Sequence, residues 1–104
     1  MTDEATEGLA GGENVLDEFR SRIDLVDAEL ISLLSERARL AVEIGKYKKI
    51  AKLPIMQPDR VRAVLDDRVA RGARAGLAPD VVRQIWSILI DEACRTQEMH
   101  GDVS

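Results

Sequence analysis

The 104-residue sequence is poor in the residue types that build disulfide-rich, metal-binding or β-rich domains. Its single cysteine, Cys94, cannot form an internal disulfide, and no set of cysteines and histidines is spaced for a metal ion. Aromatic residues make up only 3% of the chain, whereas Ala, Leu, Arg, Glu and Asp are frequent, which is typical of helices rather than of a β-sandwich. We therefore expect an all-α fold without a metal site.

Two further absences concern partners and location. The chain has 15 Lys and Arg against 19 Asp and Glu, a net charge of −4, so it lacks the basic excess that binding to duplex nucleic acid requires. No segment approaches the roughly 20 apolar residues of a membrane span, and the acidic first residues do not resemble a secretory signal. We expect a cytoplasmic protein that binds neither nucleic acid nor membrane, and whose anionic ligand, if it has one, is small.

Apolar residues recur with helical spacing over a long stretch, which predicts one helix of more than thirty residues. They are Leu16, Phe19, Ile23, Val26, Leu30, Leu33, Leu34, Leu40, Ala41, Ile44 and Tyr47. Such a helix is about 50 Å long, which exceeds the width of a compact domain of about 100 residues. It must pack against something equally long, and the simplest partner is a second copy of the chain.

The periodic pattern also predicts where the ordered domain begins and ends. Asn14 resembles a helix N-cap, while residues 1–13 offer no periodic apolar face to bury. We expect a disordered tail over residues 1–13, a helical domain over residues 14–100 and a short C-terminal tail over residues 101–104.

Proline and glycine predict two further helices. Pro54 and Pro58 enclose a short loop, after which Asp59 is the expected N-cap of a short helix. Gly76 fits the end of this helix, and Gly72 is an alternative end. Pro79 occupies the first-turn position that proline favours and begins a helix of medium length. The expected order is therefore one very long, one short and one medium helix.

Two cations lie on the apolar stripe of the long helix. Lys48 follows Arg37 by eleven positions, so the two residues differ by about 20° around the helix and by about 16 Å along it. Their long side chains could converge on one small ligand. Alternatively, Arg37 extends to solvent and Lys48 complements the negative end of the helix dipole.

Three other polar residues have both a functional and a plain interpretation. Arg20 lies about 100° around the helix from Arg37, so it could reach a pocket of the partner in an antiparallel dimer. Arg60 lies in a first helical turn, where a cation is favourable if an anion binds there. Gln97 continues the apolar stripe of the third helix and could donate into a polar pocket. Each could equally be a solvated surface residue.

The chain also lacks the usual groups of covalent and metal catalysis. It contains no Ser–His–Asp or Cys–His pairing, no phosphate-binding loop and no metal-ligand set. If the protein is an enzyme, its reaction needs neither a nucleophile nor a metal, but an anion held in a particular shape.

Four segments carry a family resemblance: "LDEFRSRID", "LLSERARLAVEIGKYK", "PIMQPDRV" and "IDEACRTQE". With them, the chain from about Val15 to Gln97 resembles the all-helical class of chorismate mutases. The resemblance implies an intertwined helical homodimer with two active sites. It also implies conversion of chorismate to prephenate without a cofactor, a step of the shikimate pathway in aromatic amino acid biosynthesis.

The resemblance implies a role for each polar position. Arg20 would bind a substrate carboxylate from the partner chain, and Arg37 would bind a carboxylate within its own chain. Lys48 and Gln97 would donate hydrogen bonds to the ether oxygen of the breaking C–O bond, and Arg60 would line the pocket. A Claisen rearrangement is unimolecular, so catalysis consists of selecting the folded conformer and stabilising charge on that oxygen.

Three positions depart from the family pattern. Val61 stands where well-known members have a glutamate that contacts the ring hydroxyl of the substrate, Gln57 stands where an aspartate is common, and Ala93 replaces a serine. Because a site discriminates less well without the group that pairs a hydroxyl, the substrate stays open among chorismate, 4-amino-4-deoxychorismate and isochorismate, the last for a pyruvate lyase.

Two non-enzymatic functions also stay open. One is a non-catalytic helical dimer that regulates a partner enzyme, since small mutases of this type can act in complexes. The other is a plain coiled-coil module, but it predicts apolar residues at positions 37 and 48, where the chain has cations.

Overall fold

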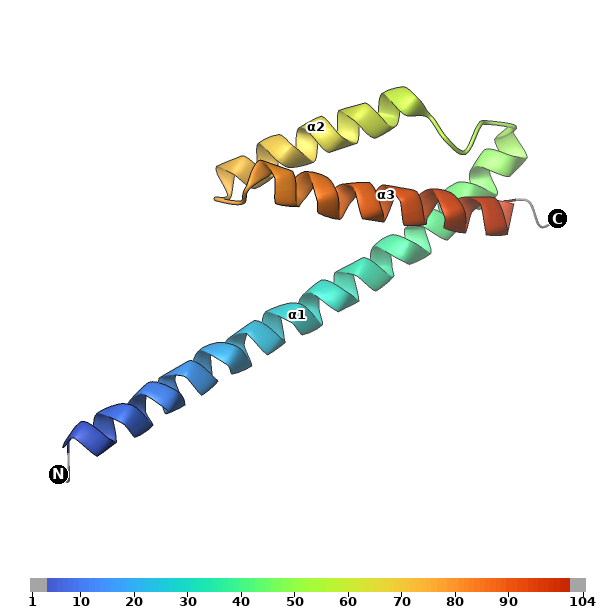
Figure 1. The fold of residues 1–104 in the computed structure, drawn as a ribbon. Coiled ribbons are helices and arrows are strands. Elements are labelled where there is room, and N and C mark those ends of the chain that lie inside the picture. The colour runs from blue at the N-terminus through green and yellow to red at the C-terminus, as the bar shows by residue number, and fades with distance from the viewer. Residues whose placement is uncertain (1–3, 102–104) are drawn as a thin grey trace. The chain divides into compact units, whose positions relative to one another are not determined.

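The computed structural model describes residues 4–101, and the side chains of residues 12–99 (Figure 1). The described residues form three helices and no strand: α1 (Glu4–Ala51), α2 (Pro58–Arg74) and α3 (Pro79–Gly101). This confirms the predicted all-α fold and the order of one very long, one short and one medium helix.

The start of α1 corrects one prediction. The helix begins at Glu4, ten residues before the expected start at Asn14. Residues 4–10 are rich in Glu and Ala, which favour a helix, and extending an existing helix requires no new nucleation. The division into a tail and a domain stays a prediction, and residues 102–104 of the C-terminal tail lie outside the described residues.

The chain consists of two compact units, Met1–Glu36 and Arg37–Ser104. In the described part of the first unit, the side chains on the predicted apolar stripe of α1 are 46–61% exposed; they are Leu16, Phe19, Ile23, Val26, Leu30 and Leu33. These residues therefore form no core in a single chain. The buried core belongs to the second unit.

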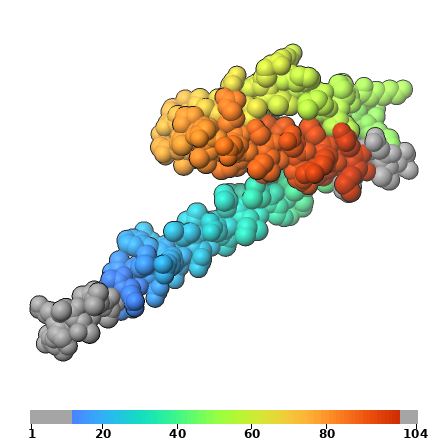
Figure 2. Space-filling view, viewed as in Figure 1, coloured from blue at the N-terminus to red at the C-terminus, as the bar shows by residue number. Residues whose placement is uncertain are grey.

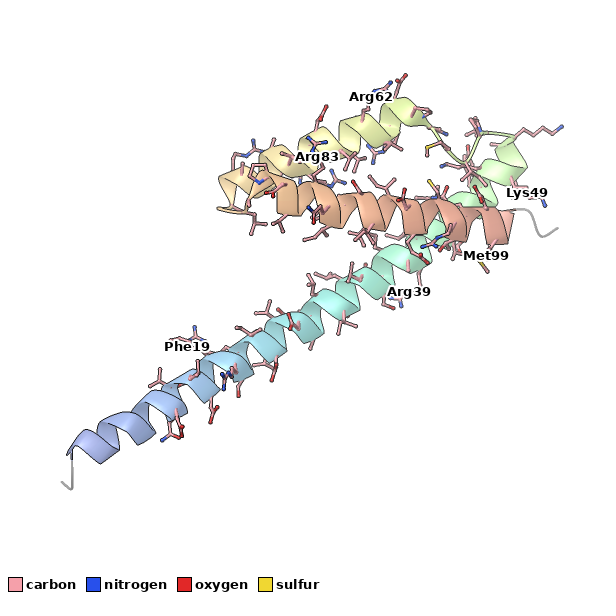
Figure 3. All side chains as sticks on the ribbon, in the orientation of Figure 1. Phe19, Arg39, Lys49, Arg62, Arg83 and Met99 are labelled. Atoms are coloured by element: carbon pink, nitrogen blue, oxygen red, sulfur yellow. The ribbon has the colours of Figure 1, made fainter. Side chains whose placement is uncertain are left out.

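In the second unit, α2 and α3 pack side by side, and their atoms form one continuous surface (Figure 2). Val64 of α2 and Val82 and Ile90 of α3 are buried. The two helices can approach closely because Gly72 has no side chain: a Cβ atom there would lie 2.6 Å from Cγ2 of Val82. At the surface, Arg83 faces α2 and its guanidinium lies 4.0 Å from the carboxylate of Asp66 (Figure 3).

The loop between α1 and α2 begins at a residue with a left-handed backbone. Lys52 has a φ of 59°. The backbone N–H of Leu53 donates to the carbonyl of Lys48 at 2.8 Å, and the N–H of Lys52 donates to that of Lys49 at 3.2 Å. This is the Schellman arrangement, which usually has glycine at the left-handed position. It ends α1 just after Lys48, so it places that residue in the last turn.

The start of α2 corrects a second prediction. Its N-cap is Gln57, with a φ of −123° and no side-chain capping bond, rather than Asp59. Pro58 occupies the first helical position, where its missing N–H is not needed. Asp59 therefore lies inside the first turn, where it forms an ion pair with Arg62. This start brings Arg60 into the first turn, as predicted.

The end of α2 agrees with the sequence. Gly76 follows the helix with a φ of 88°. The N–H of Leu77 donates to the carbonyl of Gly72 at 2.8 Å, and the N–H of Gly76 donates to that of Ala73 at 3.1 Å, which again is a Schellman end.

Among the helices of the described residues, none combines the length and apolar character needed to cross a membrane.

Candidate active site

The second unit contains a cavity of about 390 Å³ between the last turns of α1, the loop after it, α2 and α3. Its walls are largely apolar and come from all three helices; they include Leu40, Ala41 and Ile44 of α1, Val61 and Val64 of α2, and Ile90 of α3. Its size suits a small molecule rather than a polymer.

Cationic side chains from two helices converge on this cavity. Arg37 and Lys48 of α1 both line it, as does Arg60 of α2. The lining also includes Arg68 of α2, which the sequence analysis did not propose. Arg68 lies four positions after Val64 and seven after Val61, so a cation on the apolar stripe of this helix was the signal that could have revealed it.

The arginines raise the positive potential inside the cavity. Burial, together with the positive charges of Arg68 and Arg60, lowers the pKa of the Arg37 guanidinium. No Asp or Glu is among the described residues that line the cavity. A bound anion would relieve this repulsion, so the site favours negatively charged ligands.

Lys48 and Gln97 meet on one side of the cavity. The ammonium Nζ of Lys48 donates to Oε1 of Gln97 at 2.8 Å and to the backbone carbonyl of Ile55 at 2.7 Å. Gln97 is buried, with 6% of its surface exposed. An ammonium group has three N–H donors, so one remains to meet a ligand, and the Nε2 amide of Gln97 is a second donor beside it.

Gly45 of α1 allows a close approach of α1 and α3 beside Lys48 and Gln97. Gly45 is buried, and a Cβ atom at this position would lie 2.8 Å from Cα of Gln97. Only glycine lets the backbones of α1 and α3 approach so closely here. Because Gly45 precedes Lys48 by less than one helical turn, it brings the Lys48 side chain within reach of α3.

Two of the other predicted residues also line the cavity. Gln57 donates from Nε2 to the backbone carbonyl of Pro54 at 3.2 Å, so its side chain helps to shape the loop before α2. Val61 provides an apolar wall beside Arg60. Their substrate contacts stay predictions.

Arg20 is not brought to this cavity. It belongs to the first unit, is 66% exposed and lies 3.6 Å from the carboxylate of Asp17, one helical turn away. Its predicted role in the site of a partner chain concerns a second copy, so it stays a prediction.

The described lining of the cavity contains hydrogen-bond donors and cations, but no carboxylate or imidazole that could act as a base. In the part of the chain that the structure describes, no group of three or more His, Cys, Asp or Glu side chains could hold a metal ion. Cys94 lines the cavity as a half-buried free thiol. The arrangement can bind an anion and stabilise negative charge that develops on an oxygen.

Residues 19–98 match the sequence model of a known family, described as chorismate mutase type II. The chain belongs to this family. The resemblance inferred from the sequence is therefore confirmed, and with it the expectation of an isomerase of the chorismate mutase type.

The relatives that this chain matches include two groups by name, of which 4-amino-4-deoxychorismate mutases are the first. The chain is 32% identical over 91 residues to a 4-amino-4-deoxychorismate mutase of Streptomyces pristinaespiralis, a match that covers 88% of the chain and 70% of the relative. It is 31% identical over 87 residues to a 4-amino-4-deoxychorismate mutase of Streptomyces venezuelae, with 84% of each protein covered.

The second group consists of bifunctional enzymes. The chain is 33% identical over 86 residues to the bifunctional chorismate mutase/prephenate dehydratase of Escherichia coli K12. This match covers 83% of the chain but only 22% of the relative. Family membership therefore leaves the choice between the two substrates to the chemistry of the site.

Proposed function

We propose that this chorismate mutase family member rearranges chorismate to prephenate in the cavity of its second unit. The observation that carries the proposal is the convergence of Arg37, Lys48, Arg60 and Gln97 on one cavity whose described lining has no carboxylate. Chorismate has two carboxylates, and the lining matches them with positive charge. The family resemblance implies the role of each of these side chains.

The reaction requires no group that the cavity lacks. In a Claisen rearrangement the ether C–O bond breaks while a new C–C bond forms within the same molecule, so no proton or electron is exchanged with the protein. Negative charge develops on the ether oxygen in the transition state. The free N–H of Lys48 and the Nε2 amide of Gln97 lie side by side to donate to that oxygen, and each such preorganised donor is typically worth about 3–4 kcal/mol.

Selection of the folded substrate conformer is the second contribution to catalysis. Arg37 and Arg60 provide two points of attachment for carboxylates, since a guanidinium can bind a carboxylate through two parallel hydrogen bonds. The walls come from three helices and enclose about 390 Å³, which favours a folded ligand over an extended one. Holding the reacting carbons near each other supplies the entropy that the free molecule must lose.

The proposed enzyme is an intertwined homodimer. The exposed side chains at positions 16, 19, 23, 26, 30 and 33 alternate spacings of three and four residues, which is the pattern of a helix that pairs with another helix. Burying a large apolar side chain contributes about 1.5–3 kcal/mol, so pairing would strongly stabilise the dimer. Arg20, near this stripe, would then reach a carboxylate in the partner's cavity.

A substrate panel tests the proposed activity. Purified protein is incubated separately with chorismate, 4-amino-4-deoxychorismate and isochorismate, and the products are identified by NMR. We expect prephenate from chorismate. Loss of the donor in Lys48→Ala should lower kcat by about 100- to 1,000-fold, whereas Lys46→Ala should not, because Lys46 is 57% exposed, pairs with Glu43 and does not line the cavity.

The outcomes separate the competing functions. Absence of turnover with all three compounds contradicts the enzymatic proposal. Sedimentation analysis tests the dimer, and full turnover by a monomer would contradict the role of Arg20. The cytoplasmic location stays a prediction.

A regulatory dimer is the second candidate. Relatives named as bifunctional combine a chorismate mutase with a prephenate dehydratase, and this match spans 22% of the relative's length. This combination favours a partner enzyme as the target of such a regulatory dimer. In that case Lys48→Ala would leave the regulatory effect on the partner intact.

A further inference from the structure

Arg68 lies in the cavity but has no part in the mechanism above. It is on α2, eight positions after Arg60, which is about 12 Å farther along the helix. Its side chain is 29% exposed, and its guanidinium forms an ion pair with the neighbouring Asp67. The hydrogen bond from Arg68 is the largest cause that lowers the pKa of the Asp67 carboxyl.

Asp67 does not neutralise Arg68 alone, because it also binds Arg71. The Nε of Arg71 lies 3.0 Å from the same Oδ2 oxygen of Asp67 that Arg68 binds. Arg71, however, is 69% exposed and is not among the residues that line the cavity. Part of the positive charge of Arg68 therefore acts on the cavity, where it contributes to the lowered pKa of Arg37.

The charges of the occupied site do not balance. Four cations line the cavity, Arg37, Lys48, Arg60 and Arg68, and no carboxylate among the described lining residues offsets them. A substrate with two carboxylates brings only two negative charges, so the occupied cavity stays positive. Val61, next to Arg60, is apolar and supplies no countercharge.

This excess charge distinguishes between the two substrates of the relatives. Chorismate carries a neutral hydroxyl on its ring, whereas 4-amino-4-deoxychorismate carries an alkyl amine, which is protonated at neutral pH. An ammonium group is repelled in a cavity that holds surplus positive charge. A hydroxyl meets no such repulsion.

We propose that Arg68 is a specificity-determining residue of this site: with Arg37 and Arg60 it keeps the occupied cavity positive, which selects the hydroxyl-bearing substrate and rejects its amino analogue. The proposal rests on the proposed function and names the substrate of that same site. Arg68 acts through its positive charge, so a lysine at this position should largely preserve the preference for the hydroxyl-bearing substrate.

The test compares kcat/KM for chorismate and for 4-amino-4-deoxychorismate, measured on the full chain. We expect the wild-type protein to prefer chorismate, and Arg68→Gln to reduce the ratio of the two values about tenfold, as expected for one partly solvated charge. Arg62→Gln is the matched control and should leave the ratio unchanged, because Arg62 belongs to the same helix, is 69% exposed, pairs with Asp59 and does not line the cavity. Arg68→Lys should retain most of the preference.

A second variant tests the role of the excess positive charge by adding a negative charge to the cavity. Cys94→Asp adds a negative charge to the lining without replacing Arg68, and we expect it to raise the relative rate with the amino compound about tenfold. Thermal unfolding followed by circular dichroism identifies any variant that fails to fold. If Arg68→Gln fails to fold, Cys94→Asp and Arg68→Lys decide the question.

The outcomes distinguish this inference from the proposed function. A wild-type preference for the amino compound, or equal ratios in the wild type and Arg68→Gln, overturns the inference while turnover of chorismate still supports the function. If the wild type converts neither compound, the function fails. Calorimetric binding of the two compounds then replaces the rates, and equal relative affinities in the wild type and Arg68→Gln overturn the inference as well.

Discussion

Replacing Gly45 by alanine tests whether close contact between α1 and α3 positions the catalytic donors. The new Cβ would lie 2.8 Å from Cα, 3.0 Å from Cβ and 3.1 Å from Cγ of Gln97. Ordinary contacts between carbon atoms begin at about 3.5 Å, so the two helices must separate by roughly 0.7 Å. Applied to the 2.8 Å bond from Lys48 to Gln97, this displacement leads to a donor–acceptor distance at which a hydrogen bond is weak.

The stability effect is small because two contributions oppose each other. Overpacking costs about 1–3 kcal/mol, whereas alanine favours the helix over glycine by about 1 kcal/mol. We expect Gly45→Ala to be destabilised by about 0–2 kcal/mol. Its kcat should nevertheless fall by about 10- to 100-fold, since a misplacement of about 1 Å can cost 100-fold in rate.

The assay combines steady-state rates with chorismate and chemical unfolding. Gly12→Ala is the matched control, because a Cβ there would meet no atom within 4 Å; it should keep the wild-type rate. A Gly45→Ala protein with wild-type kcat would refute the argument that this glycine positions Lys48 and Gln97.

Two further predictions concern the end of α1 and the pH dependence of the reaction. Lys52→Gly should stabilise the fold by about 1 kcal/mol, because Lys52 has a φ of 59° and a left-handed backbone is costly for any residue with a Cβ. Thermal unfolding measures this gain in stability. An unchanged or lower melting temperature contradicts the prediction. The activity should not fall steeply between pH 6 and 8, because the amide of Gln97 does not titrate. In Gln97→Glu the side chain donates only when protonated, and the ordinary glutamate pKa is about 4.3, so activity should decrease as the pH rises; a flat profile would show that this side chain is not a donor.

Some features depend on residues close together in sequence, and the sequence predicted them. The apolar spacing along α1 predicted a long helix. Gly76 and Pro79 predicted where α2 ends and where α3 begins, because proline and glycine act on their own backbone and its immediate neighbours. The start of α1 and the N-cap of α2 were predicted wrongly, since several local solutions differ there by little free energy.

The residues of the site also divide into those that the sequence predicted and those that it did not. Arg37 and Lys48 were recognisable because charges on an apolar stripe violate a simple pattern, and Arg68 violates it in the same way on α2. No pattern indicated that Asp67 holds Arg68 or that four cations face one cavity without a carboxylate in its described lining. These features depend on which side of α2 faces the other helices.

By itself, the sequence determined three helices and most of their ends, because helical periodicity and turn residues act over a few positions. It also indicated the family, through the resemblance that four segments carry. Only the tertiary structure decided that Gly45 lets α3 approach α1, so that Lys48 meets Gln97 across 49 positions of sequence. Such a contact depends on the distance between two packed backbones, which is set by the volumes of all the side chains between them.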